Sequence, residues 1–146
     1  MNPPSETRPA PRVGLFVTCL ANVFRPGVAE STLRLLQQAG CTVEVPLAQS
    51  CCGQPGYNAG AIAAAKPIAR QLIETFEPFD YVVTPSGSCA GMIAHHYPKL
   101  FADEAAWQAR ALALAAKTRE ITQFLVDMPG WEAAPAQLPE ARRFTY

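Results

Sequence analysis

The stretch VGLFVTCLANVFRPGVAESTLRLLQQAGCTVEVP, residues 13–46, has the pattern of a β-strand, an α-helix and a second β-strand. Residues 13–18 form a short apolar run of strand-forming side chains, which is typical of a parallel strand buried on both faces. From Gly27, apolar residues recur at helical spacing until Gly40, a residue suited to end a helix. Residues 42–46 then read as the second strand. We therefore predict that the fold begins with a βαβ unit.

The rest of the chain continues this alternation. A long apolar stripe of helical period is followed by a strand, by a helix that should end at Pro98, and by a last helix that Asp103 can cap. The expected ranges are 62–76 for the first helix, 81–84 for the strand and 107–125 for the last helix. Pro67 lacks a backbone donor and should kink or divide its helix. We predict an α/β fold, a small parallel sheet with helices on both faces built from Rossmann-like βαβ units, because parallel strands need such crossovers.

Length and composition favour one domain with a hydrophobic core. The chain has 146 residues, of which 49% are hydrophobic, and 12 basic residues balance 12 acidic ones. This balance gives no electrostatic basis for binding nucleic acid or an anionic membrane. No apolar run approaches the roughly 20 residues of a membrane-spanning helix, and the first dozen residues are polar where a secretory signal would be apolar. We therefore expect a cytoplasmic protein without a membrane span.

The domain itself is expected to occupy residues 13–128. Residues 1–12 carry four prolines and no periodic apolar pattern, which predicts a disordered lead-in. Residues 129–146 read as a linker that ends in the opening of a further strand, Phe144-Thr145-Tyr146. We expect this strand to begin a second, missing half of a longer protein.

The five cysteines are too few and too widely spread for the disulfide framework of a small secreted protein. A free cysteine taken singly is usually a small buried apolar residue, but an adjacent pair such as Cys51-Cys52 favours metal binding or redox chemistry. The carboxyl ends of parallel strands meet at one edge of a sheet, and four cysteines each follow a predicted strand. These four are Cys19, Cys51, Cys52 and Cys89. Cys41 precedes its strand and should lie at the opposite edge, about 15 Å away, as a structural thiol.

Four thiolates suit either zinc or an iron–sulfur cluster. Structural zinc sites usually take their ligands as two close pairs. Here thirty-one residues separate Cys19 from Cys51, and thirty-six separate Cys52 from Cys89. Zinc is therefore the second choice.

Two short segments beside the cysteines favour a negatively charged cluster. Ser86-Gly87-Ser88 brings backbone N–H groups and a helix amino terminus to Cys89, an environment that lowers the pKa of a thiol and stabilises anions. Gly53 and Gly56 would let the loop backbone approach cluster sulfides closely, although both also suit an ordinary turn.

Other residues near the cysteines carry weaker signals. His95 and His96 lie too far round their helix for both to face a cluster, so we expect them at the surface. Gln54 and Tyr57 follow the cysteine pair and could hydrogen-bond cluster sulfurs, but the polarity of a loop explains them equally well. Trp107 is assigned to the core.

Cys19, the triplet Cys51-Cys52-Gly53 and the segment Ser86-Gly87-Ser88-Cys89, at these separations, resemble the CCG (cysteine-rich) domain found in heterodisulfide reductases and in the iron–sulfur subunits of glycolate oxidases. The stretches FVTCL, CCGQPGYNAG and PSGSCAGM are most similar to the iron–sulfur oxidoreductases of lactate utilisation. The likeness runs from about Val13 to Asp127. It is specific, because a vicinal cysteine pair with two outlying cysteines at matching distances rarely arises by chance.

The resemblance implies an iron–sulfur cluster, of the 4Fe-4S type, held by Cys19, Cys51, Cys52 and Cys89. The reductase pattern ends in CxxC, which would put another cysteine at Met92, so a five-cysteine non-cubane cluster would lack one ligand here. We expect a four-cysteine cluster with Met92 as a packing residue or a weak thioether neighbour. Since oxygen often strips exposed clusters, aerobically purified protein can lack it.

The resemblance also implies a role as an electron-transfer subunit of a complex that oxidises L-lactate to pyruvate. The implied partners are a ferredoxin-like iron–sulfur subunit and a third subunit, and the isolated domain is expected to be inactive. Proteins of this family also carry a second CCG half. Two alternatives stay open: a metal-free thiol/disulfide redox domain that uses Cys51 and Cys52, and a non-catalytic assembly module whose metal only holds loops in place.

Overall fold

The computed structural model describes residues 9–129, 131 and 132. The expected lead-in over 1–12 therefore lies mostly outside the described residues. So does most of the expected linker over 129–146, including the strand proposed to open a second half.

Four short parallel strands form one sheet in the order β2-β1-β3-β4. The strands are β1 (Arg12–Leu15), β2 (Thr42–Glu44), β3 (Tyr81–Thr84) and β4 (Thr118–Glu120). The predicted α/β class with a parallel sheet is confirmed. β3 has the predicted bounds, whereas β1 and β2 each end before the predicted residue.

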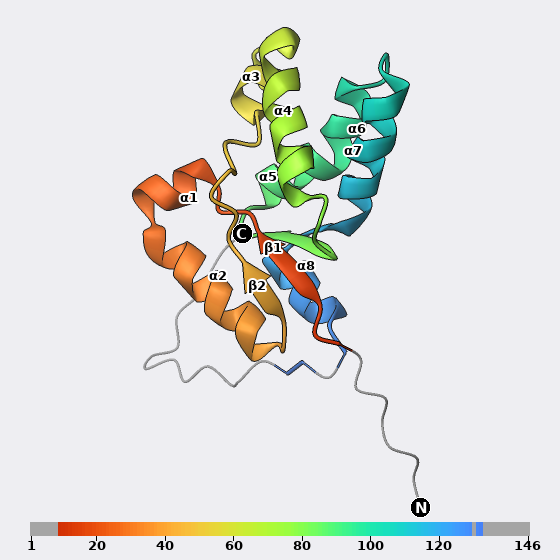
Figure 1. Cartoon of the computed structure of the whole chain (residues 1–146). Helices are drawn as coiled ribbons and strands as arrows, with labels where there is room; N and C mark the ends of the chain where they lie inside the picture. The colour runs from red at the N-terminus through yellow and green to blue at the C-terminus, as the bar shows by residue number, and fades with distance from the viewer. Residues whose placement is uncertain (1–8, 130, 133–146) are drawn as a thin grey trace, which may run out of the picture.

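Helical segments connect the strands, as Figure 1 shows. The bounds are α1 (Cys19–Phe24), α2 (Pro26–Gln38), α3 (Gln54–Asn58), α4 (Ile62–Phe76), α5 (Gly87–Gly91), the π-helix η1 (Met92–His96), α6 (Tyr97–Leu100), α7 (Ala105–Lys117) and α8 (Ile121–Asp127). None of the helices in the described ranges combines the length and the apolar character that crossing a bilayer demands.

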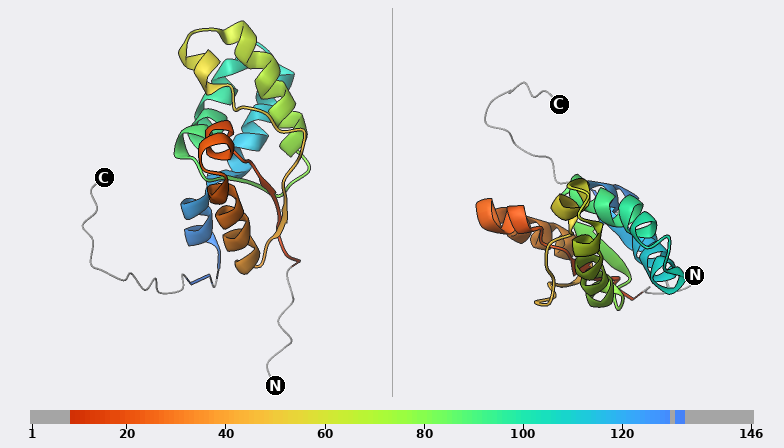
Figure 2. Two further views of the ribbon diagram at one scale, coloured as in Figure 1. Left: turned by 90° about the vertical axis from the view of Figure 1, so that its left-hand side faces the viewer. Right: turned by 90° about the horizontal axis from the view of Figure 1, so that it is seen from above.

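Two apolar clusters, one on each face of the sheet, confirm that helices cover both faces. Successive residues of β3 divide between them, since Val82 belongs to one cluster and Val83 to the other. The first cluster is packed under α4 to α7 and includes Phe16, Leu72, Ile73, Phe76, Met92 and Tyr97. The second lies under α2 and α8, which Figure 2 shows beside each other, and includes Val13, Leu15, Leu36, Cys41 and Phe124. Successive side chains of a strand point to opposite faces of the sheet, so one apolar set packs under α4 to α7 and the other under α2 and α8.

The predicted helix from Gly27 is α2, which begins one residue earlier at Pro26, but a further short helix before it was not predicted. A helix already begins at Cys19, because the Thr18 side chain caps it by accepting a hydrogen bond from the backbone N–H of Ala21 at 3.3 Å. This helix, α1, contains no buried residue, and its apolar side chains Leu20, Val23 and Phe24 are exposed. Pro26 then opens α2, where its missing N–H is not needed.

The predicted single helix over 107–125 was also wrong. Thr118 falls on the same helical stripe as Ile121, and both are buried, but the chain leaves the helical path to form β4. Thr118 pairs with Val82 in the sheet. Pairing with the free edge of β3 therefore overrides the local helical period.

The predictions for Pro98 and Asp103 were wrong, and Pro67 does not divide its helix. The helical path continues through Pro98, which occupies the first turn of α6 after a π-helical turn, and Pro67 lies inside one uninterrupted α4. Asp103 does not cap α7, which begins after Glu104. Its carboxylate instead pairs with Lys66 at 2.8 Å.

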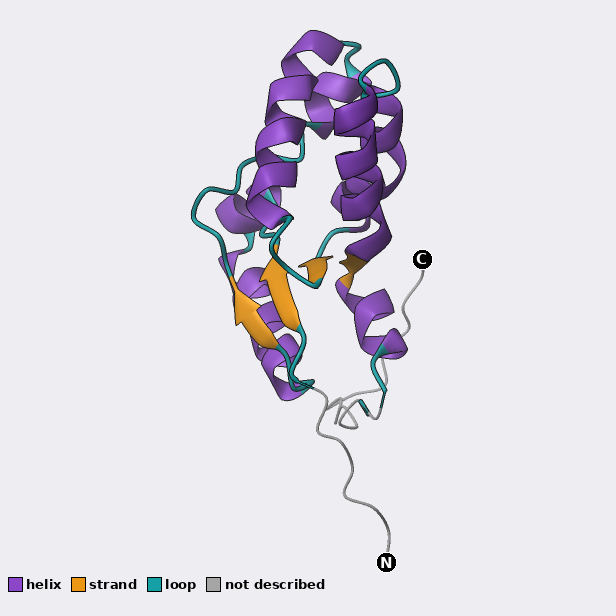
Figure 3. Ribbon diagram, turned by 45° about the vertical axis from the view of Figure 1, so that its right-hand side comes forward, coloured by secondary structure: helices purple, strands orange, loops and turns teal. Residues whose placement is uncertain are grey.

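The strands point toward the group of helices formed by α3 to α7, as Figure 3 shows. At their carboxyl ends β1 leads to α1, β2 leads to the loop before α3, and β3 leads to α5. Residues that follow these strands are consequently brought to one edge.

Candidate metal centre

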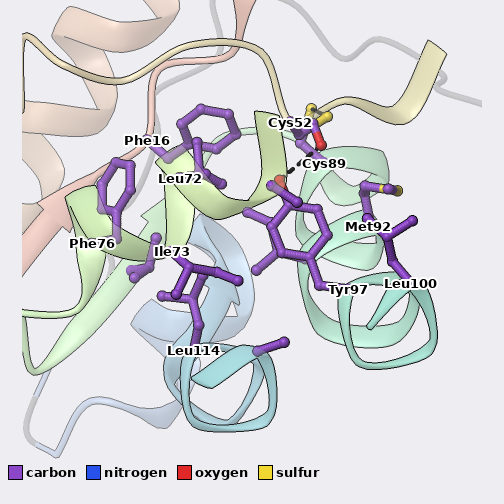
Figure 4. Packing of buried hydrophobic residues seen from close by; sticks show 14 of the residues in the cluster. Phe16, Cys52, Leu72, Ile73, Phe76, Cys89, Met92, Tyr97, Leu100 and Leu114 are labelled. Atoms are coloured by element: carbon purple, nitrogen blue, oxygen red, sulfur yellow. Dashed lines mark hydrogen bonds between the residues drawn. The ribbon is translucent and has the colours of Figure 1, made fainter. Parts of the chain in front are cut away.

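The four cysteines that follow strands all lie at the carboxyl edge of the sheet. Cys19 is the first residue of α1, Cys51 and Cys52 lie in the loop between β2 and α3, and Cys89 lies in α5. All four are free thiols. Figure 4 shows Cys52 and Cys89 together, with the ring of Tyr97 directed toward them.

The four sulfurs meet as two pairs. The Sγ atoms of Cys19 and Cys51 are 3.8 Å apart, and those of Cys52 and Cys89 are 3.5 Å apart. The two members of the vicinal pair therefore face different partners. The pairs also differ in their surroundings, since Cys52 and Cys89 are only 3% and 8% exposed, whereas Cys19 is exposed to solvent.

The two pairs do not converge on one point. Within the described ranges, no group of three or more His, Cys, Asp or Glu side chains is arranged to hold a metal ion. The two pairs still interact electrostatically, because charge on Cys89 contributes to raising the pKa of Cys19. Burial and the Cys51 thiol are the larger causes of that rise.

Hydrogen bonds give the buried pair one proton donor and one thiolate. The Cys52 thiol donates to Cys89, and together with the Ser86 and Ser88 hydroxyls it lowers the pKa of Cys89 to about 6, against the opposing effect of burial. The hydrogen bond to Cys89 is the largest cause that raises the pKa of Cys52, and burial is the second. Cys89 is therefore the more readily available ligand near neutral pH. Hydroxyl groups and the neighbouring thiol lower this pKa, and the backbone N–H groups that we expected are not among its causes.

Gly53 turns the loop directly after the vicinal pair. Its φ of 80° is left-handed, a conformation that favours glycine, and its backbone N–H donates to the Cys51 sulfur at 3.4 Å. Gly56 lies in α3, where an added Cβ would meet only the carbonyl of Ala61 at 3.9 Å. Gly53 is thus required by the loop, whereas Gly56 has room for a side chain. Gly87 also has open space around it.

Gln49 is a site residue that the sequence did not reveal. Its side-chain oxygen accepts from the Val17 N–H at 2.7 Å, and its amide nitrogen donates to the carbonyls of Pro46 at 2.9 Å and Leu15 at 3.3 Å. Gln49 therefore ties the loop that carries Cys51 to the chain that leads from β1 to Cys19. Its position between a strand and the cysteine pair was a weak signal at best.

Two buried residues beyond Cys89 line the inner side of the site. Met92 is completely buried in the cluster that contains Cys52 and Cys89. The Tyr97 hydroxyl, also fully buried, donates to the Cys52 carbonyl at 2.8 Å.

Of the remaining predictions for residues near the cysteines, some are confirmed and others are not. His95 is exposed as predicted, but His96 is half-buried, and its ring lies 4.9 Å from that of Tyr57 between centroids. Gln54 donates to the Ser88 carbonyl at 3.3 Å, so it joins two backbone segments of the site. Trp107 is only partly buried and packs against the edge of the core.

Cys41 lies apart from the other cysteines, as predicted. It precedes β2 and belongs to the second core cluster, beside Leu36 and Val13. Burial raises its pKa, which suits a structural thiol.

A cavity of about 610 Å³ opens beside the solvent-exposed pair Cys19 and Cys51. Its walls include apolar side chains of β1, α2 and the loop after β2, such as Leu33 and Leu47. Glu30 is the one charged residue among the described residues that line it. The Glu30 carboxylate is itself paired with the guanidinium of Arg34, one turn further along α2.

Bacterial proteins of known name are similar to this chain over most of its length. Lactate utilization protein A of Bacillus cytotoxicus is 51% identical over 117 residues, which cover 80% of this chain and 48% of that protein. Lactate utilization protein A 1 of Bacillus cereus strain AH820 is 49% identical over 128 residues, which cover 88% of this chain and 53% of that protein. The chain thus spans about half the length of the curated relatives it matches. No solved structure gives a significant match.

The cysteine-rich domain family, CCG, matches residues 13–94, more than half of the chain. This range contains all four cysteines of the carboxyl edge, from Cys19 to Cys89. The resemblance seen in the sequence is therefore confirmed, and the chain belongs to the CCG cysteine-rich domain family.

Proposed function

We propose that this chain is an iron–sulfur electron-transfer domain of a complex that oxidises L-lactate to pyruvate. The observation that carries the proposal is the meeting of four free thiols from three distant segments at one edge of the sheet. The names of the relatives support the connection with lactate utilisation.

The thiol donor set fits an iron–sulfur cluster, which is held by cysteine thiolates. The preference for a cluster over zinc rests on the wide spacing of the cysteines in the sequence, which lacks the two close ligand pairs of a structural zinc site, and on the family match. Cys19, Cys51, Cys52 and Cys89 would hold the cluster, of the 4Fe-4S type. When bound, it would supply the transfer of single electrons.

The protein gives the two sides of the site different tasks. Cys52 and Cys89 are buried among apolar side chains, which exclude water from the inner side. Cys19 faces solvent at the start of α1, whose Leu20, Val23 and Phe24 are 68%, 71% and 72% exposed. We infer that electrons pass through the Cys19 side, where a ferredoxin-like partner subunit can approach.

Lactate itself is expected to react on another subunit. Conversion of lactate to pyruvate releases two electrons and two protons, and the substrate carboxylate needs a cationic partner. The cavity beside Cys19 and Cys51 offers Glu30 instead. The chain alone is therefore proposed to be inactive. We propose that its role requires a third subunit and the second CCG half that would account for the greater length of the relatives.

A thiol/disulfide redox domain without metal is the second candidate, and the sulfur pairing favours it specifically. Sγ atoms at 3.5 and 3.8 Å need only small movements to form disulfides. We also propose a cytoplasmic location, because the spacing of the five cysteines lacks the disulfide framework of a small secreted protein.

Iron and acid-labile sulfide in anaerobically purified protein test the leading proposal. We expect both, with a brown colour, and we expect Cys52→Ala to remove most of each. Cys41→Ala is the matched control, since Cys41 lies in the other core cluster. Protein that contains zinc alone, or a Cys41→Ala variant that loses as much iron as Cys52→Ala, would reject the assignment.

A further inference from the structure

The peptide group between Cys52 and Gly53 is hydrogen-bonded at both ends. Its carbonyl oxygen accepts from the Tyr97 hydroxyl at 2.8 Å, and its N–H donates to the Cys51 sulfur at 3.4 Å. The Tyr97 hydroxyl, the Cys52–Gly53 peptide and the Cys51 sulfur thus form a chain of two hydrogen bonds, here called the relay, from a core tyrosine to a candidate ligand sulfur. Figure 4 shows Tyr97 rising from the buried cluster toward Cys52.

A π-helical turn brings Tyr97 to this position. Tyr97 follows Cys89 by eight residues, and in a regular α-helix this spacing would leave the two side chains about 80° apart around the axis. In η1 the Tyr97 N–H bonds to the Met92 carbonyl, five residues back, so that turn holds one additional residue. The additional residue removes about 100° of rotation and returns Tyr97 to within about 20° of the face of Cys89.

Tyr97 is suited to act only as a donor. It has no exposed surface, and burial, together with the nearby cysteines, raises the pKa of its hydroxyl. The Tyr97 hydroxyl donates its hydrogen bond to the Cys52 carbonyl. The left-handed φ of Gly53 turns its N–H back toward the Cys51 sulfur, and the Tyr97 hydroxyl holds the carbonyl end of the same peptide.

We propose that Tyr97 is a positioning residue that sets the reduction potential of the site by fixing the peptide N–H that hydrogen-bonds the Cys51 sulfur. This inference rests on the proposed iron–sulfur function. Hydrogen bonds to ligand sulfurs stabilise the more negatively charged, reduced cluster and so raise its potential. A donor at the far end of the same peptide strengthens the bond by polarising it and by holding it in place.

The test compares Tyr97→Phe with Tyr81→Phe in the anaerobically purified, iron-loaded chain. Tyr81 is the control because it begins β3 at the opposite edge, where its ring packs on Phe124 at 5.2 Å between centroids. We expect Tyr97→Phe to have a more negative midpoint potential than the wild type. The potential of Tyr81→Phe should equal the wild-type value.

A second measurement uses the metal-free chain and amide hydrogen exchange. Tyr97→Phe should speed exchange of the Gly53 amide by up to about tenfold, while the Val82 amide in the sheet keeps its rate. Equal acceleration of both amides would mean general destabilisation and would overturn the proposal. So would an unchanged midpoint potential in a fully loaded Tyr97→Phe variant. If the wild-type chain takes up no iron at all, the proposed function and the tuning of its potential fail together. The exchange of the Gly53 amide then still shows whether the relay positions this peptide.

Discussion

The backbone N–H of Val17 donates a 2.7 Å hydrogen bond to the side-chain oxygen of Gln49, 32 positions further along the chain. The bond joins the segment before Cys19 to the loop before Cys51. The two sulfurs, 3.8 Å apart, depend on this junction because each lies only two residues from it.

Gln49→Leu should weaken both the fold and the site. The change leaves the half-buried Val17 N–H without its acceptor, at a cost of about 1–3 kcal/mol in the free energy of unfolding. Urea denaturation of the metal-free protein measures this loss, and iron retention in the presence of a chelator measures the effect on the site. Gln123→Leu is the control, since Gln123 is exposed and bonds only within α8, to Asp127. Equal stability of the two variants would contradict the role given to Gln49.

Thr18→Ala should loosen α1 and expose Cys19 further. Loss of an N-cap costs about 1 kcal/mol, and α1 has no buried side chain to compensate. Alkylation of Cys19 in the metal-free protein should therefore become faster, measured by mass spectrometry with Cys41 as the internal reference. Thr18→Ser keeps the capping hydroxyl and should retain the wild-type rate. If the serine and alanine variants react equally fast, the cap does not hold this helix.

The sequence predicted those parts of the fold whose signals are local. The strand over 81–84 is an apolar run bounded by turn-forming residues, and it has the predicted bounds. β4 was missed because Thr118 fits a helical stripe, and only the distant edge of β3 makes a strand there more favourable. α1 was missed because its six residues are fewer than the window over which an apolar period can be recognised.

The same limit applied to the candidate site. Topology was sufficient to place Cys19 and Cys89 at one edge, since both follow strands of a parallel sheet. The topology could not show which sulfurs lie next to each other. It also could not identify Gln49 and Tyr97, whose hydrogen-bond partners lie far away in the chain. The position of Tyr97 further depends on a π turn, for which the sequence offered only Pro98 as a sign of irregular helix.

Oxidation of the metal-free protein should form two cross-linked pairs. Each pair loses two electrons and two protons to hydrogen peroxide, which is reduced to two molecules of water. We expect disulfides Cys19–Cys51 and Cys52–Cys89, identified by peptide mapping without reduction, because these sulfurs are already paired. Cys41 should stay reduced. A predominant vicinal disulfide between Cys51 and Cys52 would show that the loop rearranges before it reacts.

Gly14→Ala should destabilise the domain by about 1–3 kcal/mol. An added Cβ would lie 2.7 Å from ring atoms of both Phe76 and Phe79, so the buried rings must move. Gly27→Ala provides the opposite control, because it lies in α2 with no atom within 4 Å of the added Cβ, and alanine favours the helix. Thermal unfolding of the metal-free variants measures both changes. A Gly14→Ala variant as stable as Gly27→Ala would show that β1 does not pack this closely on α4.

Glu77→Gln should make the stability of the metal-free domain less dependent on pH under acidic conditions. The Glu77 carboxylate accepts two hydrogen bonds from Arg110 of α7, at 2.6 and 2.8 Å, and this contact lowers the pKa of Glu77 from its ordinary value of 4.5 despite partial burial. The ion pair therefore stabilises the fold fully above pH 4.5, and its contribution disappears as the pH falls through the lowered pKa. Because the pair is partly exposed, the free energy of unfolding of the wild type should exceed that of Glu77→Gln by only about 0.2–1 kcal/mol at about pH 6.5.

Urea denaturation of both proteins between about pH 6.5 and about pH 3 should show this difference in stability disappearing at the acidic end. Glu44→Gln, at an exposed carboxylate with no ion-pair partner among the described residues, should follow the wild-type curve throughout. A gap between wild type and Glu77→Gln that widened toward low pH would reverse the sign of the linkage and exclude the pair as its source.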